Sequence, residues 1–154
     1  MALLRLRPAT PGEEDLLGEL CLRSKAVWGY DAAFLAACRA ELRPDAEAVA
    51  SGRVQVAQLD ARIAGCVEIS VANQEAHLEK LFVEPGLIGS GVGAQLMDWA
   101  AGEAARLGAR EMVIEADPGA VSFYLRLGAR EAGTAPSGSI PGRMLPRLVL
   151  ELSA

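Results

Sequence analysis

Several residue types are scarce in this chain, and each shortage excludes a class of protein. There are 3 cysteines, Cys21, Cys38 and Cys66, and their spacing fits no metal site. We therefore expect reduced thiols in a cytoplasmic protein, with neither a disulfide framework nor a bound metal. No apolar run approaches the roughly 20 residues of a membrane helix, so we expect no membrane association, and the start of the sequence predicts no signal peptide.

Positive charge is also in short supply. The chain has 15 Lys and Arg residues against 20 Asp and Glu residues, which gives a formal net charge of -5. The basic residues are scattered singly along the chain, whereas a nucleic-acid-binding surface needs them gathered. We therefore expect no nucleic-acid partner. A length of 154 residues is typical of one domain, and we expect residues 1–154 to form a single one.

Apolar residues alternate between strand spacing and helix spacing, without a linker or a repeat. A first strand is expected around Leu4 and Leu6. Thr10, Pro11 and Glu13 have the pattern of a capping box, which predicts the start of a helix. The apolar positions that this helix should bury are Leu16, Leu17, Leu20 and Cys21. A second helix is predicted from Asp31 to Pro44, with a short helical piece after it, and a hairpin is predicted around Asp60–Arg62.

The most informative stretch is a strand at roughly residues 75–83 that leads through a glycine-rich turn into a helix. The glycines of the turn are Gly89, Gly91 and Gly93. Because they carry no Cβ, backbone amides can close around an anion, and the helix directs the positive end of its dipole toward it. The next strand, around Met112–Ile114, completes a βαβ unit with parallel strands. A helix and two more strands should close the chain.

Two families of protein use such a turn. Residues 89–94 fit the G-x-G-x-x-A fingerprint of dinucleotide-binding domains, and Glu115 stands where a ribose-binding acid belongs. However, the turn lies more than halfway along the chain, and too little sequence follows it for the second half of a Rossmann sheet. A lone fingerprint of this kind is also common by chance.

More of the chain resembles the GNAT superfamily of acyl-CoA-dependent N-acetyltransferases. The residues that carry the resemblance are Leu81-x-Val83-x-Pro85, Gly89-x-Gly91-Val92-Gly93, Leu96, and Ala120-x-x-Phe123-Tyr124-x-x-x-Gly128-Ala129. The resemblance implies an α/β (α+β) domain. In such a domain a mixed, mostly antiparallel sheet of about seven strands is flanked by about four helices around the parallel βαβ unit.

The resemblance further implies that acetyl-CoA is the co-substrate and that no metal takes part. Its pantetheine arm would pair with the backbone of Leu81, Phe82 and Val83. The residues that would hold its pyrophosphate are Gly89, Ser90, Gly91, Val92, Gly93 and Ala94. Two positions depart from the family pattern. Ile88 replaces a Gln or Arg, and Gly119 replaces an Asn, so a polar contact is in doubt at each.

Three catalytic candidates follow from the resemblance. Tyr124 matches the family's proton donor, and a phenol is protonated at neutral pH. His77 and Glu79 share one face of the strand before the turn and are candidates for the base, with Glu68 as a weaker option. The alternatives stay open: Tyr124 can be a core residue, and the proton of the amine can leave through water.

An acceptor site is expected between the early helices and the late strands. Trp28 and Tyr30 offer aromatic walls, Asp31 can attract an amine, and Arg143 can pair with a carboxylate. Equally, Asp31 can cap a helix and Trp28 can pack in the core. The expected partner is a small-molecule amine or a peptide, and a homodimer is left open. A non-catalytic acyl-CoA-binding or interaction domain of the same fold is the alternative function.

Overall fold

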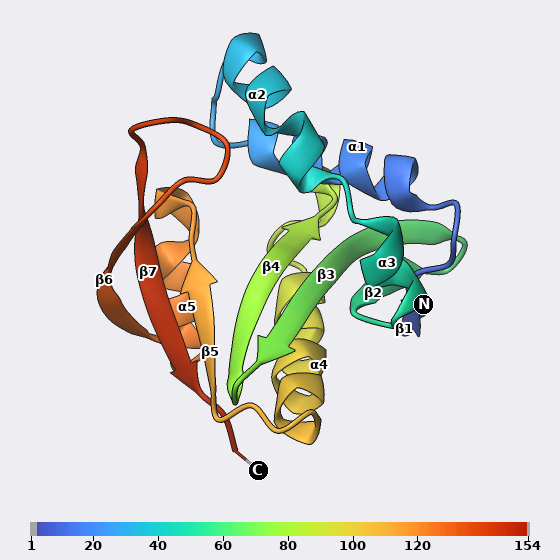
Figure 1. The fold of residues 1–154 in the computed structure, drawn as a ribbon. Helices are drawn as coiled ribbons and strands as arrows, with labels where there is room; N and C mark the ends of the chain where they lie inside the picture. Colours follow the sequence, from blue (N-terminus) through green and yellow to red (C-terminus); the bar gives the residue numbers. More distant parts are fainter. Residues whose placement is uncertain (1–2, 154) are drawn as a thin grey trace. The chain divides into compact units, whose positions relative to one another are not determined.

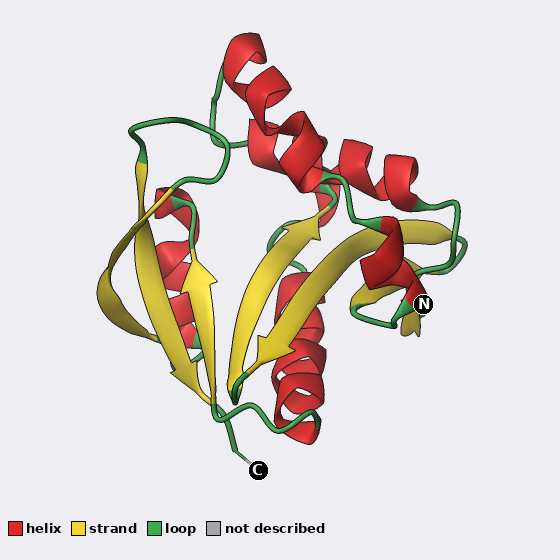
Figure 2. Ribbon diagram, viewed as in Figure 1, coloured by secondary structure: helices red, strands yellow, loops and turns green. Residues whose placement is uncertain are grey.

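The computed structural model describes residues 3–153, in which strands and helices alternate as the sequence predicts (Figures 1 and 2). The strands are β1 (Leu4–Pro8), β2 (Val54–Leu59), β3 (Arg62–Ala72), β4 (Glu75–Val83), β5 (Glu111–Glu115), β6 (Arg130–Pro136) and β7 (Met144–Glu151). The α-helices are α1 (Glu14–Ala26), α2 (Ala32–Leu42), α3 (Ala46–Ala50), α4 (Val92–Arg106) and α5 (Val121–Arg126). Two short 3-10 helices, η1 (Pro85–Leu87) and η2 (Pro118–Ala120), precede α4 and α5.

The seven strands form a mixed sheet in the order β1-β2-β3-β4-β5-β7-β6. The pairs β1–β2, β2–β3, β5–β7 and β6–β7 are antiparallel, and β4–β5 is parallel. The predicted sheet and its central parallel pair are therefore confirmed. The short helical piece after Pro44 also forms, as α3, so residues 3–153 hold five α-helices where about four were expected.

The chain divides into two compact units, and each is described by itself. The first consists of the chain up to Glu68 together with Lys80–Asp98, and the second of Ile69–Glu79 together with the chain from Trp99 onward. The glycine turn and the early helices therefore belong to the first unit. The end of β3, the start of β4 and the later strands belong to the second.

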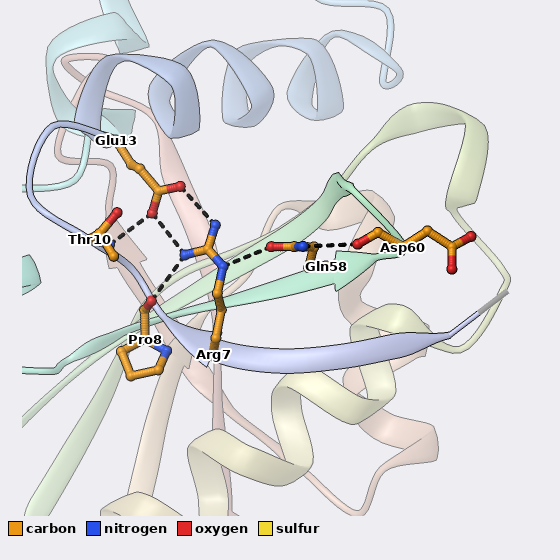
Figure 3. Close-up of polar contacts among 6 residues, drawn as sticks. All are labelled: Arg7, Pro8, Thr10, Glu13, Gln58 and Asp60. Atoms are coloured by element: carbon orange, nitrogen blue, oxygen red, sulfur yellow. Dashed lines mark hydrogen bonds and ion pairs between the residues drawn. The ribbon is translucent and has the colours of Figure 1, made fainter.

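The start of α1 differs from the predicted capping box. The carboxylate of Glu13 does accept a hydrogen bond from the Thr10 N–H, at 2.8 Å, as such a box requires (Figure 3). However, Gly12 has a φ of 99°, which no residue of a right-handed helix adopts, so Thr10–Glu13 forms a separate turn and the helix begins at Glu14. The guanidinium of Arg7 binds both carboxylate oxygens of Glu13, at 2.8 and 3.0 Å, and donates to Gln58 Oε1 at 2.9 Å.

Helix α1 buries one stripe of the apolar residues that the sequence singled out. Leu17, Leu20 and Cys21 are buried, at the spacing of one helix face. Leu16 is 57% exposed, so the prediction that it is buried is wrong. It lies one position before Leu17, about 100° around the helix axis from that stripe. The Cys21 Sγ lies 3.7 Å from the Cys66 Sγ on β3, which places α1 directly against that strand.

The predicted turn at Asp60–Arg62 and the turn between β3 and β4 both have residues of positive φ at their tips. Asp60 has a φ of 53° between β2 and β3, where Leu59 pairs with Arg62. Between β3 and β4, Asn73 and Gln74 have φ values of 53° and 65°. Two successive positive values match the type I′ turn, whose twist suits a tight hairpin.

In the second unit, the paired strands bury several residues of one face. Ala76 pairs with Met112 and Ile114 pairs with Leu148, and all four are at most 1% exposed. Leu150, which pairs with Met112, lies on the same face. A Cβ on Gly128, just after α5, would lie 3.8 Å from Leu150, which places the end of α5 against this face. Glu75 and His77 alternate with these positions and lie on the opposite face.

Candidate functional site

The glycine turn of the first unit has the backbone that the sequence predicts. Gly89 and Gly91 have φ values of 88° and 94°, which side-chain-bearing residues rarely adopt. Ser90 lies between them, and both its N–H and its hydroxyl donate to the Leu87 carbonyl. A Cβ on Gly89 or Gly91 would meet no atom within 4 Å, so the space beside both glycines is open. The turn therefore fits a group that approaches the backbone closely.

Helix α4 begins directly at this turn. Its first hydrogen bond runs from the Gln95 N–H to the Gly91 carbonyl, at 3.2 Å. The N–H groups of Val92, Gly93 and Ala94 precede that bond, so they have no acceptor within the helix. Gly93 belongs to this first helical turn, unlike the other two glycines. Amides and helix dipole together can bind an anion such as a pyrophosphate.

The end of β4 packs closely against β3. Leu81, Phe82 and Val83 are half-buried, and the Phe82 carbonyl passes over Gly65. A Cβ on Gly65 would lie 2.7 Å from the Phe82 oxygen and 3.0 Å from the Leu96 side chain. Gly65 therefore lets β4 and α4 approach β3. Sequence reasoning missed it, although a glycine within an apolar strand is a known signal of close backbone approach.

A buried ion pair lies beside this segment. The Lys80 ammonium is 3.2 Å from the Glu68 carboxylate, and the two side chains are only 9% and 8% exposed. Burial of two charges is costly unless they pair, which explains why they lie together. The sequence singled out Glu68 as a weak candidate for the base but missed Lys80. The signal for Lys80 was a charged residue at a strand position that the alternation of Leu78 and Phe82 would bury.

The two departures from the family pattern lie on the surface. Ile88 is 51% exposed at the start of the glycine turn, so its apolar side chain adds no polar contact. Gly119, in the second unit, is exposed and donates its N–H to Asp117 Oδ1 at 3.1 Å. Asp117 thus caps η2 and orders the approach to α5.

Tyr124 is the buried side chain of α5. Its residue is 7% exposed, and its ring meets that of Phe123 edge to face, with centroids 5.1 Å apart. Burial raises the pKa of the Tyr124 phenol above its usual value of 10. The hydroxyl is therefore protonated throughout the physiological range and can act only as a proton donor there.

The candidates for the base lie on β4 in the second unit. The His77 Nε2 is 3.0 Å from the Glu75 carboxylate, and both side chains are partly exposed. Glu79 is exposed further along the strand. His77 lies on the face opposite Met112 and Leu150, whereas the end of α5 lies against the latter face. The structure therefore brings His77 together with Glu75 and places His77 away from the face that α5 covers.

The early aromatic segment belongs to the first unit. Asp31 caps α2, because its carboxylate accepts the Phe34 N–H at 2.8 Å. Tyr30 stacks on Phe34 with ring centroids 4.0 Å apart, and the Lys25 ammonium lies 5.3 Å from the Tyr30 centroid. Trp28 is 46% exposed, so the alternative that it packs in the core is wrong. The aromatic surfaces that the sequence predicts are therefore present, and the Lys25 ammonium already lies against the ring of Tyr30.

Arg143 lies at the base of the loop between β6 and β7 in the second unit. Its guanidinium is 3.8 Å from the Asp117 carboxylate, and both side chains are largely buried. The loop is closed by the Ser137 N–H, which donates to the Arg143 carbonyl at 2.8 Å, and by the Ser137 hydroxyl, which accepts from Ser139 and Ile140. Arg143 therefore connects this loop to the start of η2.

Two further findings concern the described part of the chain only. None of its helices combines the length and the apolar character needed to cross a bilayer. Within residues 3–153, no three His, Cys, Asp or Glu side chains gather as metal ligands would.

Comparison with known proteins places the chain in a family. No curated protein sequence matches it closely. Among solved structures, the PaiA N-acetyltransferase of Thermoplasma acidophilum, in complex with coenzyme A, has a TM-score of 0.81 at 16% identity, over 97% of this chain and 99% of that one. The ribosomal-protein-S18-alanine N-acetyltransferase of Escherichia coli has a TM-score of 0.71 at 18% identity, with 99% and 96% covered. YncA of Salmonella typhimurium, with acetyl-CoA, has a TM-score of 0.66 at 20% identity, with 97% and 94% covered.

These likenesses establish the fold. A sequence model of the acetyltransferase (GNAT) domain matches residues 24–136, which is most of the chain and includes the glycine turn and Tyr124. The resemblance inferred from the glycine turn and the Phe-Tyr pair is thereby confirmed, and the chain belongs to the GNAT acetyltransferase family.

Proposed function

We propose that this protein is a cytoplasmic N-acetyltransferase that moves an acetyl group from acetyl-CoA to a primary amine of a small molecule or peptide. The observation that carries the proposal is the turn Gly89–Gly91. In a chain of the GNAT family, two glycines of positive φ connect the end of η1, which follows β4, to the N-terminus of α4. The open space beside both glycines supports the fit of a pyrophosphate at this point.

The strand before the turn supports a place for the pantetheine arm. Residues of β4 pair with β5 from Glu75↔Glu111 to Leu78↔Ile114, and β4 then continues to Val83. In this proposal the backbone groups of Leu81, Phe82 and Val83 bind the arm as a neighbouring strand would. Acetyl-CoA supplies an activated acetyl group as a thioester, and residues of the chain supply binding and proton transfer.

Tyr124 is proposed as the acid. Direct attack of a neutral amine on the thioester releases a thiolate. This thiolate must take up a proton, and the thiol that forms has a usual pKa near 8.5. Tyr124 would donate its phenolic proton to the departing sulfur, and its raised pKa keeps that proton in place until charge develops. Solvent would then return a proton to the phenolate.

The base is proposed to be His77 or Glu79, with water as the alternative. The contact of His77 with Glu75 supports His77, because a neighbouring carboxylate orients the imidazole ring. Glu68 is the weakest candidate, since Lys80 already holds its carboxylate. Rate against pH for His77→Ala and Glu79→Ala decides between them. The base is the residue whose substitution removes the fall in rate at low pH. If that fall is unchanged in both variants, the proton of the amine leaves through water.

The acceptor is proposed to be an amine that meets Trp28, Tyr30, Asp31 and Arg143. Exposure of Trp28 and the aromatic stack of Tyr30 support an aromatic wall. Asp31 and Arg143 already have partners within the protein, so a substrate would have to share or displace them.

The proposed function is tested by calorimetry with acetyl-CoA and by turnover against a panel of primary amines. We expect binding of acetyl-CoA but not of NAD, and thiol release with at least one amine. Binding without turnover on any amine or peptide would favour a non-catalytic acyl-CoA-binding domain. Tight binding of NAD instead would restore the dinucleotide-binding interpretation.

A further inference from the structure

Glu84 lies at the junction between β4 and the glycine turn, and it is held through three different groups. Its N–H donates to the Ala64 carbonyl on β3 at 2.8 Å. Its carbonyl accepts the Leu87 N–H at 2.8 Å, which starts η1. Its carboxylate receives two hydrogen bonds from the Arg23 guanidinium on α1, at 2.9 and 2.8 Å. The chain then runs through η1 to Gly89 without another element.

Of the three, only the bidentate contact between Arg23 and Glu84 joins the junction to α1. Two parallel N–H···O bonds fix the plane of the carboxylate as well as its distance. The Glu84 side chain is 21% exposed, and the Arg23 bonds lower its pKa below the usual value. The carboxylate therefore stays ionised and paired at neutral pH.

The packing of α1 against β3 holds Arg23 in position beside Glu84. Cys21, two residues earlier on α1, is fully buried against Cys66 of β3. The helix therefore cannot slide along the strand without breaking that packing. The Arg23 side chain is 52% exposed, and ion pairs of this exposure contribute little to global stability. The effect of the Arg23–Glu84 pair is instead on the local geometry of the junction between β4 and the turn.

We propose that the Arg23–Glu84 ion pair is a positioning device that fixes the direction in which the chain leaves β4 and enters the cofactor turn. This inference rests on the proposed function, in which the turn binds the pyrophosphate of acetyl-CoA. Without Arg23, the junction is held only by backbone bonds of β3 and η1 and can pivot about them. The N–H groups of Val92, Gly93 and Ala94 are then no longer held in one orientation. The affinity for acetyl-CoA falls because the site is less pre-organised.

The test compares Arg23→Ala and Glu84→Gln with the wild type in calorimetry with acetyl-CoA. We expect the Kd to rise about 3- to 10-fold in both variants, while kcat at saturating acetyl-CoA is unchanged. The double variant Arg23→Glu with Glu84→Arg should recover most of the affinity that either single reversal loses. The matched control is Arg43→Ala, which removes another ion pair of α1, that with Asp15 at 2.6 Å. It should leave the Kd unchanged.

A second measurement does not need the ligand. Amide hydrogen exchange of residues 86–92 in the free protein should accelerate several-fold in Arg23→Ala and stay unchanged in Arg43→Ala. Wild-type protein that binds no acetyl-CoA would overturn the proposed function, and the exchange experiment would still decide whether Arg23 holds the turn. Binding by the wild type, with equal affinity and equal exchange in Arg23→Ala, would overturn the positioning role alone. An equal loss of affinity in Arg43→Ala would overturn it too.

Discussion

At the scale of single residues, Tyr124 shows how one environment serves both packing and chemistry. Its ring packs against Phe123 within the second unit, as a core residue would. The same burial raises the pKa of its hydroxyl, so the phenol stays protonated at neutral pH. Burial therefore does not separate the core interpretation from the catalytic one, and only removal of the hydroxyl does.

We predict that Tyr124→Phe lowers kcat about 10- to 100-fold, because the hydroxyl donates its proton only as the thiolate forms. The Kd for acetyl-CoA should change less than about 2-fold, since the ring and its packing remain. Stopped thiol-release assays and calorimetry measure the two quantities. The control is Phe123→Leu, which disturbs the same aromatic pair without touching the hydroxyl. Equal kcat in Tyr124→Phe would return Tyr124 to a packing role.

Glu13 gives a residue-scale prediction that concerns stability alone. The Arg7 guanidinium holds the pKa of Glu13 at about 2, against a usual value of 4.5 (Figure 3). Because the folded pKa lies below the unfolded one, the pair stabilises the fold fully above pH 4.5. That contribution is lost as the pH falls toward 2.

Glu13→Gln should therefore lower the free energy of unfolding by about 1–2 kcal/mol at pH 7, after allowance for the partial exposure of the pair. The difference from the wild type should shrink between pH 4.5 and 2. Urea unfolding at several pH values measures it. A difference that does not depend on pH would show that the charge of Glu13 contributes nothing.

At the scale of elements, the sequence predicted those that local chemistry specifies. Asp31 caps α2, which is one of the two roles that the sequence offered for it, and the turn at Asp60 lies where the hairpin was predicted. The start of α1 could not be predicted correctly, because the pattern of Thr10 and Glu13 does not show that Gly12 is left-handed. The contact of Glu84 with Arg23 joins two elements that are far apart in the sequence, and no local pattern encodes it. That of Glu68 with Lys80 joins two consecutive strands, and it depends on their register.

The glycines of the turn differ from those of the helix that follows. We predict that Gly91→Val weakens acetyl-CoA binding at least 10-fold, because valine is strained at a φ of 94° and its side chain fills the open space beside the turn. Gly102→Ala is the control on the same helix. A Cβ there meets nothing within 4 Å, and alanine favours a helix by up to about 1 kcal/mol. It should raise the Tm slightly and leave the Kd unchanged. Unchanged affinity in Gly91→Val would contradict the role of the turn.

Gly65 makes a prediction about how strands pack. Gly65→Ala places a Cβ 2.7 Å from the Phe82 oxygen, so β4 must shift and the protein should lose about 1–3 kcal/mol of stability. Gly86→Ala is the control, since its Cβ meets no atom within 4 Å. Urea unfolding should show a clear loss for the first variant and a change below about 0.5 kcal/mol for the second. Equal stability of both variants would mean that β4 adapts without cost.

At the scale of the whole molecule, charge and cysteine chemistry bear on ligand binding. The chain has a formal net charge of -5, so an anionic co-substrate gains nothing from the overall field, and its binding must rest on local amides and dipoles.

The three cysteines are buried and free. The hydrogen bond between the thiols of Cys21 and Cys66, together with burial, raises the pKa of the Cys21 thiol well above its usual value. This suppresses the reactive thiolate. That residues 1–154 form a single domain stays a prediction.

The buried thiols turn ligand binding into a measurable property of the whole fold. In native buffer, an excess of a disulfide reagent such as DTNB should label Cys21, Cys38 and Cys66 only through opening of the structure. Acetyl-CoA at about 100 times its Kd should stabilise the folded state by about 2.7 kcal/mol and slow labelling about 100-fold, if opening is fast relative to labelling. NAD at the same concentration should leave the rate unchanged. Rapid labelling of any cysteine in the free protein would contradict its burial. Labelling that acetyl-CoA does not slow would show that the cysteines become accessible through openings that leave the binding site intact.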